Sequence, residues 1–314
     1  MSASHSSYFV WKASLTTLLL LGAIASFACS TPKTNPISEA VDIRRVTDEA
    51  GRTVNVPAKI ERYISLAPNL TEIGYAIGAG DRLVGNTTYC DYPEVAKKVQ
   101  KVGDTLQPNI ERILALRPQL VLVSTASQLE SFTRTLDQHG IAVYVTDPKD
   151  LEAVFRSLEN LGKLLNEQQH AEQLVAQLRG RANAVGESVK RSKQIRVFYQ
   201  LSAEPLYTAG RDSFVTDLIR RAGGISVTAD VPEAWPRYSQ EAAVAARPEA
   251  IVLPTGGSMG SANSGVAEGL KRSPAALSGK IYKINGDFLS RPGPRAVDGL
   301  EELARALHPE AFKP

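Results

Sequence analysis

Apolar and polar positions between residues 61 and 147 follow two alternating patterns. Strands are predicted at 61–67, 82–88, 119–125 and 141–147, and the runs at 119–125 and 141–147 are apolar enough for buried strands. The segments between them have helical patterns, at 70–80, 108–118 and 129–140. Apolar strands that alternate with helices are typical of a parallel sheet covered on both faces. This half of the chain is therefore predicted to form an α/β lobe.

A hairpin is expected before that lobe, at 46–57, with Gly51 supplying the positive φ of its turn. From 151 to 192 the pattern is purely helical. Asn166 is the expected N-cap of a second helix over 167–190, which would be about 36 Å long and could bridge two lobes. From Gln194 the alternation resumes. The expected strands and helices are 195–201, 213–224, 239–248, 249–255, 279–285 and 297–309.

An internal repeat links the two halves. Residues 110–123 read IERILALRPQLVLV, and residues 240–253 read QEAAVAARPEAIVL. At one constant offset the two segments share four identities, namely Glu111 with Glu241, Ala115 with Ala245, Arg117 with Arg247, and Pro118 with Pro248. The repeat predicts two similar α/β lobes with central, mostly parallel sheets, joined by a single long backbone helix. A ligand cleft is expected between such lobes.

The amino-terminal segment is predicted to be a processed leader. The apolar run 13–24 is too short to span a bilayer, but it suits the core of a signal peptide. Ser26-Phe27-Ala28 is a cleavage site, and Cys29 would then be the first mature residue, available for a lipid anchor. Ordinary cleavage without lipidation is the alternative. The Ser-, Thr-, Pro- and Asn-rich segment after Cys29 is typical of a flexible tether.

The expected organisation has five parts. They are a signal peptide (1–28), a flexible tether (29–45), an amino-terminal α/β lobe (46–150), a helical linker with the backbone helix (151–192) and a carboxy-terminal α/β lobe (193–314).

Composition narrows the function. The net charge is +3, and removal of the leader deletes one lysine and no acidic residue, so the mature chain carries +2. No dense basic tract or zinc-finger spacing occurs, so nucleic acid is not expected as a partner. The four histidines lack metal-ligand spacing, and no catalytic motif occurs, so neither an enzyme nor a metal site is expected. If Cys29 carries lipid, Cys90 is unpaired; a disulfide between them is the alternative.

Three long segments carry a family resemblance: VTDEAGRTVNVPAKIERYISLAPNLTEI, PNIERILALRPQLVLV and RPGPRAVDGLEELARALHPE. The chain resembles the class III periplasmic binding proteins, the helical-backbone group that serves vitamin B12, haem and ferric-siderophore ABC importers. The resemblance implies an exported monomer, in the periplasm or on the outer face of the cytoplasmic membrane. It also implies an ABC permease and its ATPase as partners, a metal-centred ligand and no cofactor of the protein's own. A scaffold or adhesin, the competing interpretation, would have no cleft.

The segments TTYCDYP, PLYTAGRDSF and EAWPRYSQE are similar to ligand-binding segments of the cobalamin receptors. The resemblance implies that Tyr89, Tyr207 and Trp235 contact a corrinoid, although Tyr92 could replace Tyr89. Wide aromatic faces suit such a large, flat and mostly apolar ring. The chain departs from those receptors at Thr105, where they have a tryptophan.

Charged residues allow a second class of ligand and a role in docking to a partner. Arg237, Arg291 and Arg295 lie in Pro- and Gly-containing loops, where their guanidinium groups could bind the anionic groups of a ferric siderophore or of haem. Glu111 and Glu241 match the pair of glutamates, one on each lobe, that engages permease arginines in this family. Such rim charges mainly set orientation and association rate.

Overall fold

The computed structural model describes residues 42–124, 129–256 and 265–313, which belong to one compact unit that starts at Val41. Within it, β1 (Ile43–Thr47) pairs antiparallel with β2 (Thr53–Pro57), and Gly51 takes a φ of 79° in the turn, as predicted. The fold therefore begins earlier than expected. The end of the predicted tether (29–45) was wrong because residues 43–45 already pair with β2.

The first lobe contains a four-stranded parallel sheet in the order β4-β3-β5-β6. Its strands are β3 (Tyr63–Ser65), β4 (Leu83–Asn86), β5 (Leu120–Ser124) and β6 (Ala142–Thr146). Its helices are α1 (Pro68–Ala76), α2 (Ile110–Ala115) and α3 (Leu129–Gln138). All of β6 and most of β5 are buried, as the apolar runs predicted.

The second lobe repeats this topology, in the order β10-β7-β11-β12. Its parallel strands are β7 (Ile195–Tyr199), β10 (Gly224–Ser226), β11 (Ala250–Thr255) and β12 (Ile281–Asn285), and a small ribbon pairs β8 (Ser202–Ala203) with β9 (Leu206–Tyr207). Its helices are α6 (Phe214–Arg221), α7 (Gln240–Ala245), α8 (Pro274–Leu277), α9 (Gly286–Ser290) and α10 (Ala296–Leu307). In chain order, each sheet runs second, first, third, fourth.

The repeated segment has the same local structure in both lobes. The pattern of buried and exposed positions over 111–120 is identical to that over 241–250. Arg117 and Arg247 both adopt left-handed backbone, with φ values of 46° and 48°. Asn109 and Ser239 cap α2 and α7 in the same way, each accepting a backbone N–H three residues later. The sequence identities therefore belong to a structural duplication.

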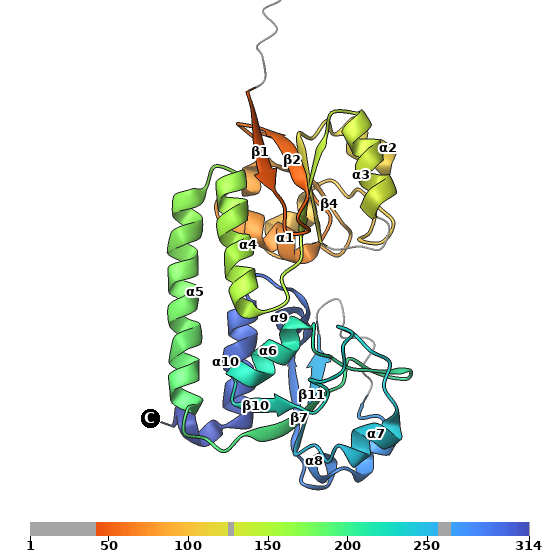
Figure 1. The fold of residues 1–314 in the computed structure, drawn as a ribbon, viewed down its shortest axis with the longest axis vertical. Coiled ribbons are helices and arrows are strands. Elements are labelled where there is room, and N and C mark those ends of the chain that lie inside the picture. Colours follow the sequence, from red (N-terminus) through yellow and green to blue (C-terminus); the bar gives the residue numbers. More distant parts are fainter. Residues whose placement is uncertain (1–41, 125–128, 257–264, 314) are drawn as a thin grey trace, which may run out of the picture. The chain divides into compact units, whose positions relative to one another are not determined.

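Two helices connect the lobes. Figure 1 shows α4 (Leu151–Leu164) and α5 (Gln168–Val189) side by side. The prediction that Asn166 caps α5 was wrong: Asn166 has a φ of 58° in the turn between the helices, and Glu167 is the N-cap. Asparagine tolerates left-handed backbone better than most residues, which suits it to this reversal.

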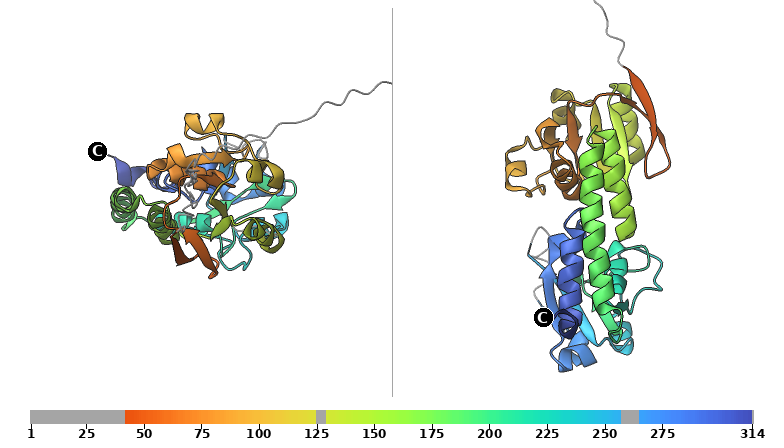
Figure 2. Two further views of the ribbon diagram at one scale, coloured as in Figure 1. Left: turned by 90° about the horizontal axis from the view of Figure 1, so that it is seen from above. Right: turned by 90° about the vertical axis from the view of Figure 1, so that its left-hand side faces the viewer.

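Helix α5 is bonded to both lobes. Near its start, Glu167 forms an ion pair of 2.7 Å with Arg82 of the first lobe. Further along, Arg181 pairs with Asp298 and Glu301 of α10, at 2.6 and 2.9 Å. Figure 2 shows α10 beside α5. One continuous hydrophobic core includes residues of both sheets together with α4, α5 and α10.

None of the helices in the described ranges is long and apolar enough to cross a membrane.

Candidate functional site

A cleft of about 450 Å³ lies between the two lobes. The first lobe contributes residues at the start of α1 and in two loops, and the second lobe contributes residues near β7, α7 and α9. The lining residues are Pro68, Asn69, Tyr89, Thr105, Leu201, Trp235, Ser290 and Arg291. The loops therefore bring segments that are more than 200 residues apart in the sequence to one site.

Tyr89 and Trp235 offer aromatic surface to this cleft from opposite lobes. Their side chains are 50% and 40% exposed. The Trp235 ring packs against the buried ring of Tyr199 in a tilted arrangement, at a centroid distance of 6.3 Å and an interplanar angle of 51°. Partly exposed aromatic rings of this kind suit a large apolar ligand. Thr105 also lines the cleft, where it offers less apolar area than a tryptophan would.

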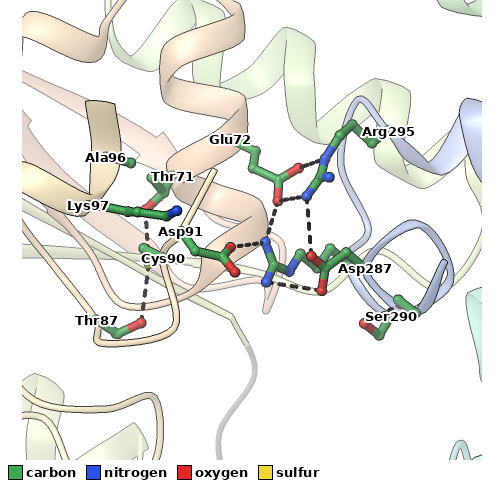
Figure 3. Close-up of polar contacts among 12 residues, drawn as sticks. Thr71, Glu72, Thr87, Cys90, Asp91, Ala96, Lys97, Asp287, Ser290 and Arg295 are labelled. Atoms are coloured by element: carbon green, nitrogen blue, oxygen red, sulfur yellow. Dashed lines mark hydrogen bonds and ion pairs between the residues drawn. The ribbon is translucent and has the colours of Figure 1, made fainter. Parts of the chain in front are cut away.

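Five charged residues form an ion cluster beside the cleft, and it joins the lobes. Its members are Glu72 of α1, Asp91 of the loop after β4, Asp287 of α9, and Arg291 and Arg295 after α9. Glu72 is buried within the first lobe and accepts hydrogen bonds from both arginines of the second lobe, at 2.6–2.9 Å. Figure 3 shows Glu72, Asp91, Asp287 and Arg295 converging there. The ion cluster thus ties the lobes together at the cleft.

The ion pairs favour the charged forms of Arg291, Arg295 and Asp91. Burial alone would lower the pKa of Arg291, but its hydrogen bonds to Asp91 and Glu72 raise that pKa above its ordinary value. The pKa of Arg295 is raised in the same way, against burial, by Glu72. Burial alone would raise the pKa of the Asp91 carboxyl, but the hydrogen bond and charge of Arg291 lower it. These guanidinium groups are therefore held by carboxylates of the protein itself.

The loop that carries Tyr89 is attached to the second lobe by its next residues. Asp91 contacts Arg291 at 2.8 Å, and the guanidinium carbon of Arg295 lies 4.0 Å from the centre of the Tyr92 ring. Both Tyr89 and Tyr92 are about half exposed, but only Tyr89 is among the lining residues of the cleft. Of the two tyrosines that the sequence left as alternatives, Tyr89 therefore lies at the cleft, and Tyr92 contacts the guanidinium of Arg295.

Two other residues predicted to contact the ligand do not line the cleft. Tyr207 is half-buried on β9, where it forms a backbone bridge with the exposed Arg237, and neither residue is among the lining residues of the cleft. The ribbon β8–β9 holds them in this position. Cys29 lies outside the described residues.

Glu111 and Glu241 are exposed in the first turns of α2 and α7, at matching places of the two lobes. The Glu241 carboxylate accepts a hydrogen bond from Ser239 at 3.0 Å. Its own backbone N–H and this bond lower its pKa. The two carboxylates present the same charge at equivalent positions, and exposure leaves them open to a partner.

Within the described ranges, no group of three or more His, Cys, Asp or Glu side chains is placed to hold a metal ion. Cys90 is a buried free thiol between the hydroxyls of Thr71 and Thr87, each 3.2 Å from its sulfur.

Sequence reasoning missed Glu72, Asp91 and Asp287. A signal for Glu72 existed, because it is a charge inside the otherwise apolar helix LTEIGYA, and buried glutamates are almost always paired. Nothing local to the chain indicated that its partners lie about 220 residues later. The leucine, serine, proline and asparagine that line the cleft were missed as well, since they carry no chemical signal of their own.

Comparison with known proteins agrees with this geometry. A family model described as periplasmic binding protein matches residues 64–283. The ABC transporter substrate-binding lipoprotein YvrC of Bacillus subtilis (strain 168) is 31% identical, over 96% of this chain and 99% of its own.

Two solved structures share the fold. The periplasmic vitamin B12 binding protein BtuF of Vibrio cholerae is 29% identical with a TM-score of 0.72, over 82% of this chain and 100% of its own. The periplasmic haem-binding protein RhuT of Roseiflexus sp. RS-1 is 27% identical with a TM-score of 0.70, over 80% and 99%. The predicted family resemblance and the two-lobed α/β fold are confirmed.

Proposed function

The chain belongs to the periplasmic binding protein family, and from this premise we propose that it is the extracytoplasmic substrate-binding protein of an ABC importer, with a corrinoid as its ligand. The relative YvrC is described as an ABC transporter substrate-binding protein, and BtuF as a vitamin B12 binding protein. Binding proteins of this kind are not enzymes.

The choice of a corrinoid rests on the kinds of side chain that line the cleft. Tyr89 and Trp235 face it from opposite lobes, while the guanidinium of Arg291 is held by protein carboxylates. Aromatic faces with few available cations favour a large ring with uncharged substituents. A ferric siderophore with anionic groups would need the arginines that the ion cluster already uses. Haem remains the second candidate because RhuT binds it on the same fold.

Replacing Trp235 by alanine is expected to weaken cyanocobalamin binding about tenfold, because the corrin ring loses one of its two aromatic contacts. The measurement is calorimetric titration of residues 41–314, with haem and a ferric siderophore as comparators. We expect the unmodified protein to bind cyanocobalamin with a sub-micromolar Kd, about −8 kcal/mol or better.

The matched control is Leu277→Ala on α8. It removes another largely exposed apolar side chain, and Leu277 does not line the cleft. It should leave affinity unchanged. Equal affinities of the Trp235→Ala variant and the unmodified protein would remove Trp235 from the site. Binding of haem or siderophore without corrinoid would keep the importer role and replace the ligand.

The same proposal places the protein at a membrane surface. The relative YvrC is described as a lipoprotein, and Cys29 follows a leader-like segment. We expect Cys29 to carry the lipid. Replacing Cys29 by serine should move the protein from the membrane fraction to the soluble extracytoplasmic fraction, as measured by fractionation and by labelling with a radioactive fatty acid. Label retained by the serine variant would contradict the assignment. Cys90→Ser serves as the control, because Cys90 is buried in the folded body.

A further inference from the structure

Lys101 is bonded to three points of the loop that carries Tyr89 to the cleft. Its ammonium donates to the side-chain oxygen of Asn86 at 2.7 Å and to the backbone carbonyls of Cys90 and Ala96, both at 3.2 Å. These three oxygens match the three donors of an ammonium group. Asn86 is fully buried and donates in turn to the Ala96 carbonyl at 2.9 Å. Lys101 therefore ties both ends of the loop to its middle.

Few apolar contacts hold this loop in place. Between residues 87 and 100 it contains no strand or α-helix. Only three of these residues are buried, namely Thr87, Cys90 and Ala96. The Cys90 thiol adds contacts of 3.2 Å to two threonine hydroxyls (Figure 3). Asp91 and Tyr92 attach the loop to the second lobe, and Lys101 attaches its middle to the first. Because little apolar area is buried, these polar contacts determine how firmly the loop is held.

The position of the Tyr89 ring depends on this backbone. Tyr89 directly precedes Cys90, whose carbonyl accepts a hydrogen bond from Lys101, and the tyrosine side chain is 50% exposed. A half-exposed ring has few packing contacts of its own, so the backbone beside it determines where the ring lies. Tyr89 lines the cleft, whereas Lys101 does not. Any effect of Lys101 on a ligand must therefore pass through the residues that it holds.

We propose that Lys101 is a positioning residue for ligand binding, because it fixes the loop that presents Tyr89 to the cleft. The inference rests on the proposed function in taking this cleft as the binding site. Asp91 also interacts with the Lys101 ammonium, although Asp91 is not among the lining residues. An effect that passes through Asp91 instead of Tyr89 is therefore the alternative that the test must separate.

The test is a double-variant cycle, with cyanocobalamin as the ligand and calorimetric titration as the measurement. Lys101→Met keeps an aliphatic stem and removes the three donors. We expect it to weaken binding about fivefold, because a loosened loop has to be ordered when the ligand binds. In a protein that already carries Tyr89→Ala, the same substitution should weaken binding less than about twofold. Losses that simply multiply would overturn the role of Lys101 in positioning Tyr89.

Lys97→Met is the matched control. Lys97 belongs to the same loop and also interacts with Asp91, but its ammonium pairs with Glu94 and its side chain is 53% exposed. This variant should keep the affinity of the unmodified protein. A loss equal to that of Lys101→Met would assign the effect to charge near Asp91 and overturn the proposal. Lys101→Gln, which keeps a polar end group, gives the same cycle if the methionine variant does not fold.

Hydrogen exchange of the loop amides tests the positioning without any ligand. The amides of Thr88, Cys90 and Ala96 donate to backbone carbonyls in or beside the loop, and a loosened loop would expose them to solvent. We expect faster exchange over residues 87–100 in Lys101→Met and unchanged exchange in Lys97→Met. Equal exchange in Lys101→Met and in the unmodified protein overturns the proposal.

The role of Lys101 and the corrinoid assignment fail in different ways. If the unmodified protein binds haem and no cyanocobalamin, the corrinoid assignment fails, and the same cycle with haem decides the role of Lys101. If the protein binds cyanocobalamin and the losses multiply, only the role of Lys101 fails. A protein that binds neither ring overturns both proposals.

Discussion

Replacing Glu72 by alanine is expected to lower the free energy of unfolding by about 3–5 kcal/mol, the usual cost of removing one partner from a buried ion pair. The Glu72 side chain is 2% exposed and is bonded to two arginines of the other lobe. Without the Glu72 carboxylate, the two guanidinium groups stay in a buried site with fewer negative charges to pair with, and they repel each other. Chemical denaturation followed by circular dichroism measures the change.

Glu61→Ala is the matched control for this substitution. Glu61 also forms an ion pair, with Lys59 at 2.6 Å, but both side chains are more than half exposed. Such exposed surface pairs contribute little to stability. A loss in Glu72→Ala as small as that in Glu61→Ala would show that the ion cluster does not hold the lobes together.

Replacing both Glu111 and Glu241 by alanine is expected to reduce transport about a hundredfold at limiting protein concentration. A loss of about tenfold for each of two docking ion pairs accounts for this factor. Both glutamates are exposed, and both occupy the same position of the repeated segment. Their identity in the two lobes is not required by packing, which suggests that an external partner constrains them. The measurement is ligand uptake by vesicles that contain the permease and its ATPase.

Ligand affinity and a control double variant test whether the effect is specific to docking. Ligand affinity of the double variant should be unchanged, because neither glutamate lines the cleft. The control Glu61→Ala with Glu187→Ala removes two other exposed glutamates and should transport normally. Unchanged uptake by the Glu111 and Glu241 variant would remove the docking role.

The sequence predicted most of the fold because its signals are local. Buried strands appear as apolar runs, and a repeated helix, proline and strand reveal the duplication. The exceptions have physical causes. Strand β10 was missed because it is only three residues long and contains Gly224 and the exposed Ile225, so it shows no apolar run. Asn166 was misassigned because asparagine is common both at N-caps and in left-handed turns.

The candidate site was predictable only in part. Tyr89 and Trp235 carry their own signal, as aromatic residues in loops, and both lie at the cleft. Arg291 and Arg295 were expected to offer charge to a ligand, and the structure places them against Glu72. Which charge meets which depends on contacts between the lobes, and a single sequence carries no local trace of such contacts.

The hydrophobic core that both lobes share also affects how the chain can fold. Helix α10 supplies the last apolar residues of that core, including Leu300, Leu303 and Leu307. The contacts between α5 and α10 form only when these residues are present. Because one core includes residues of both sheets, we expect truncation at the carboxy-terminal end to destabilise both lobes.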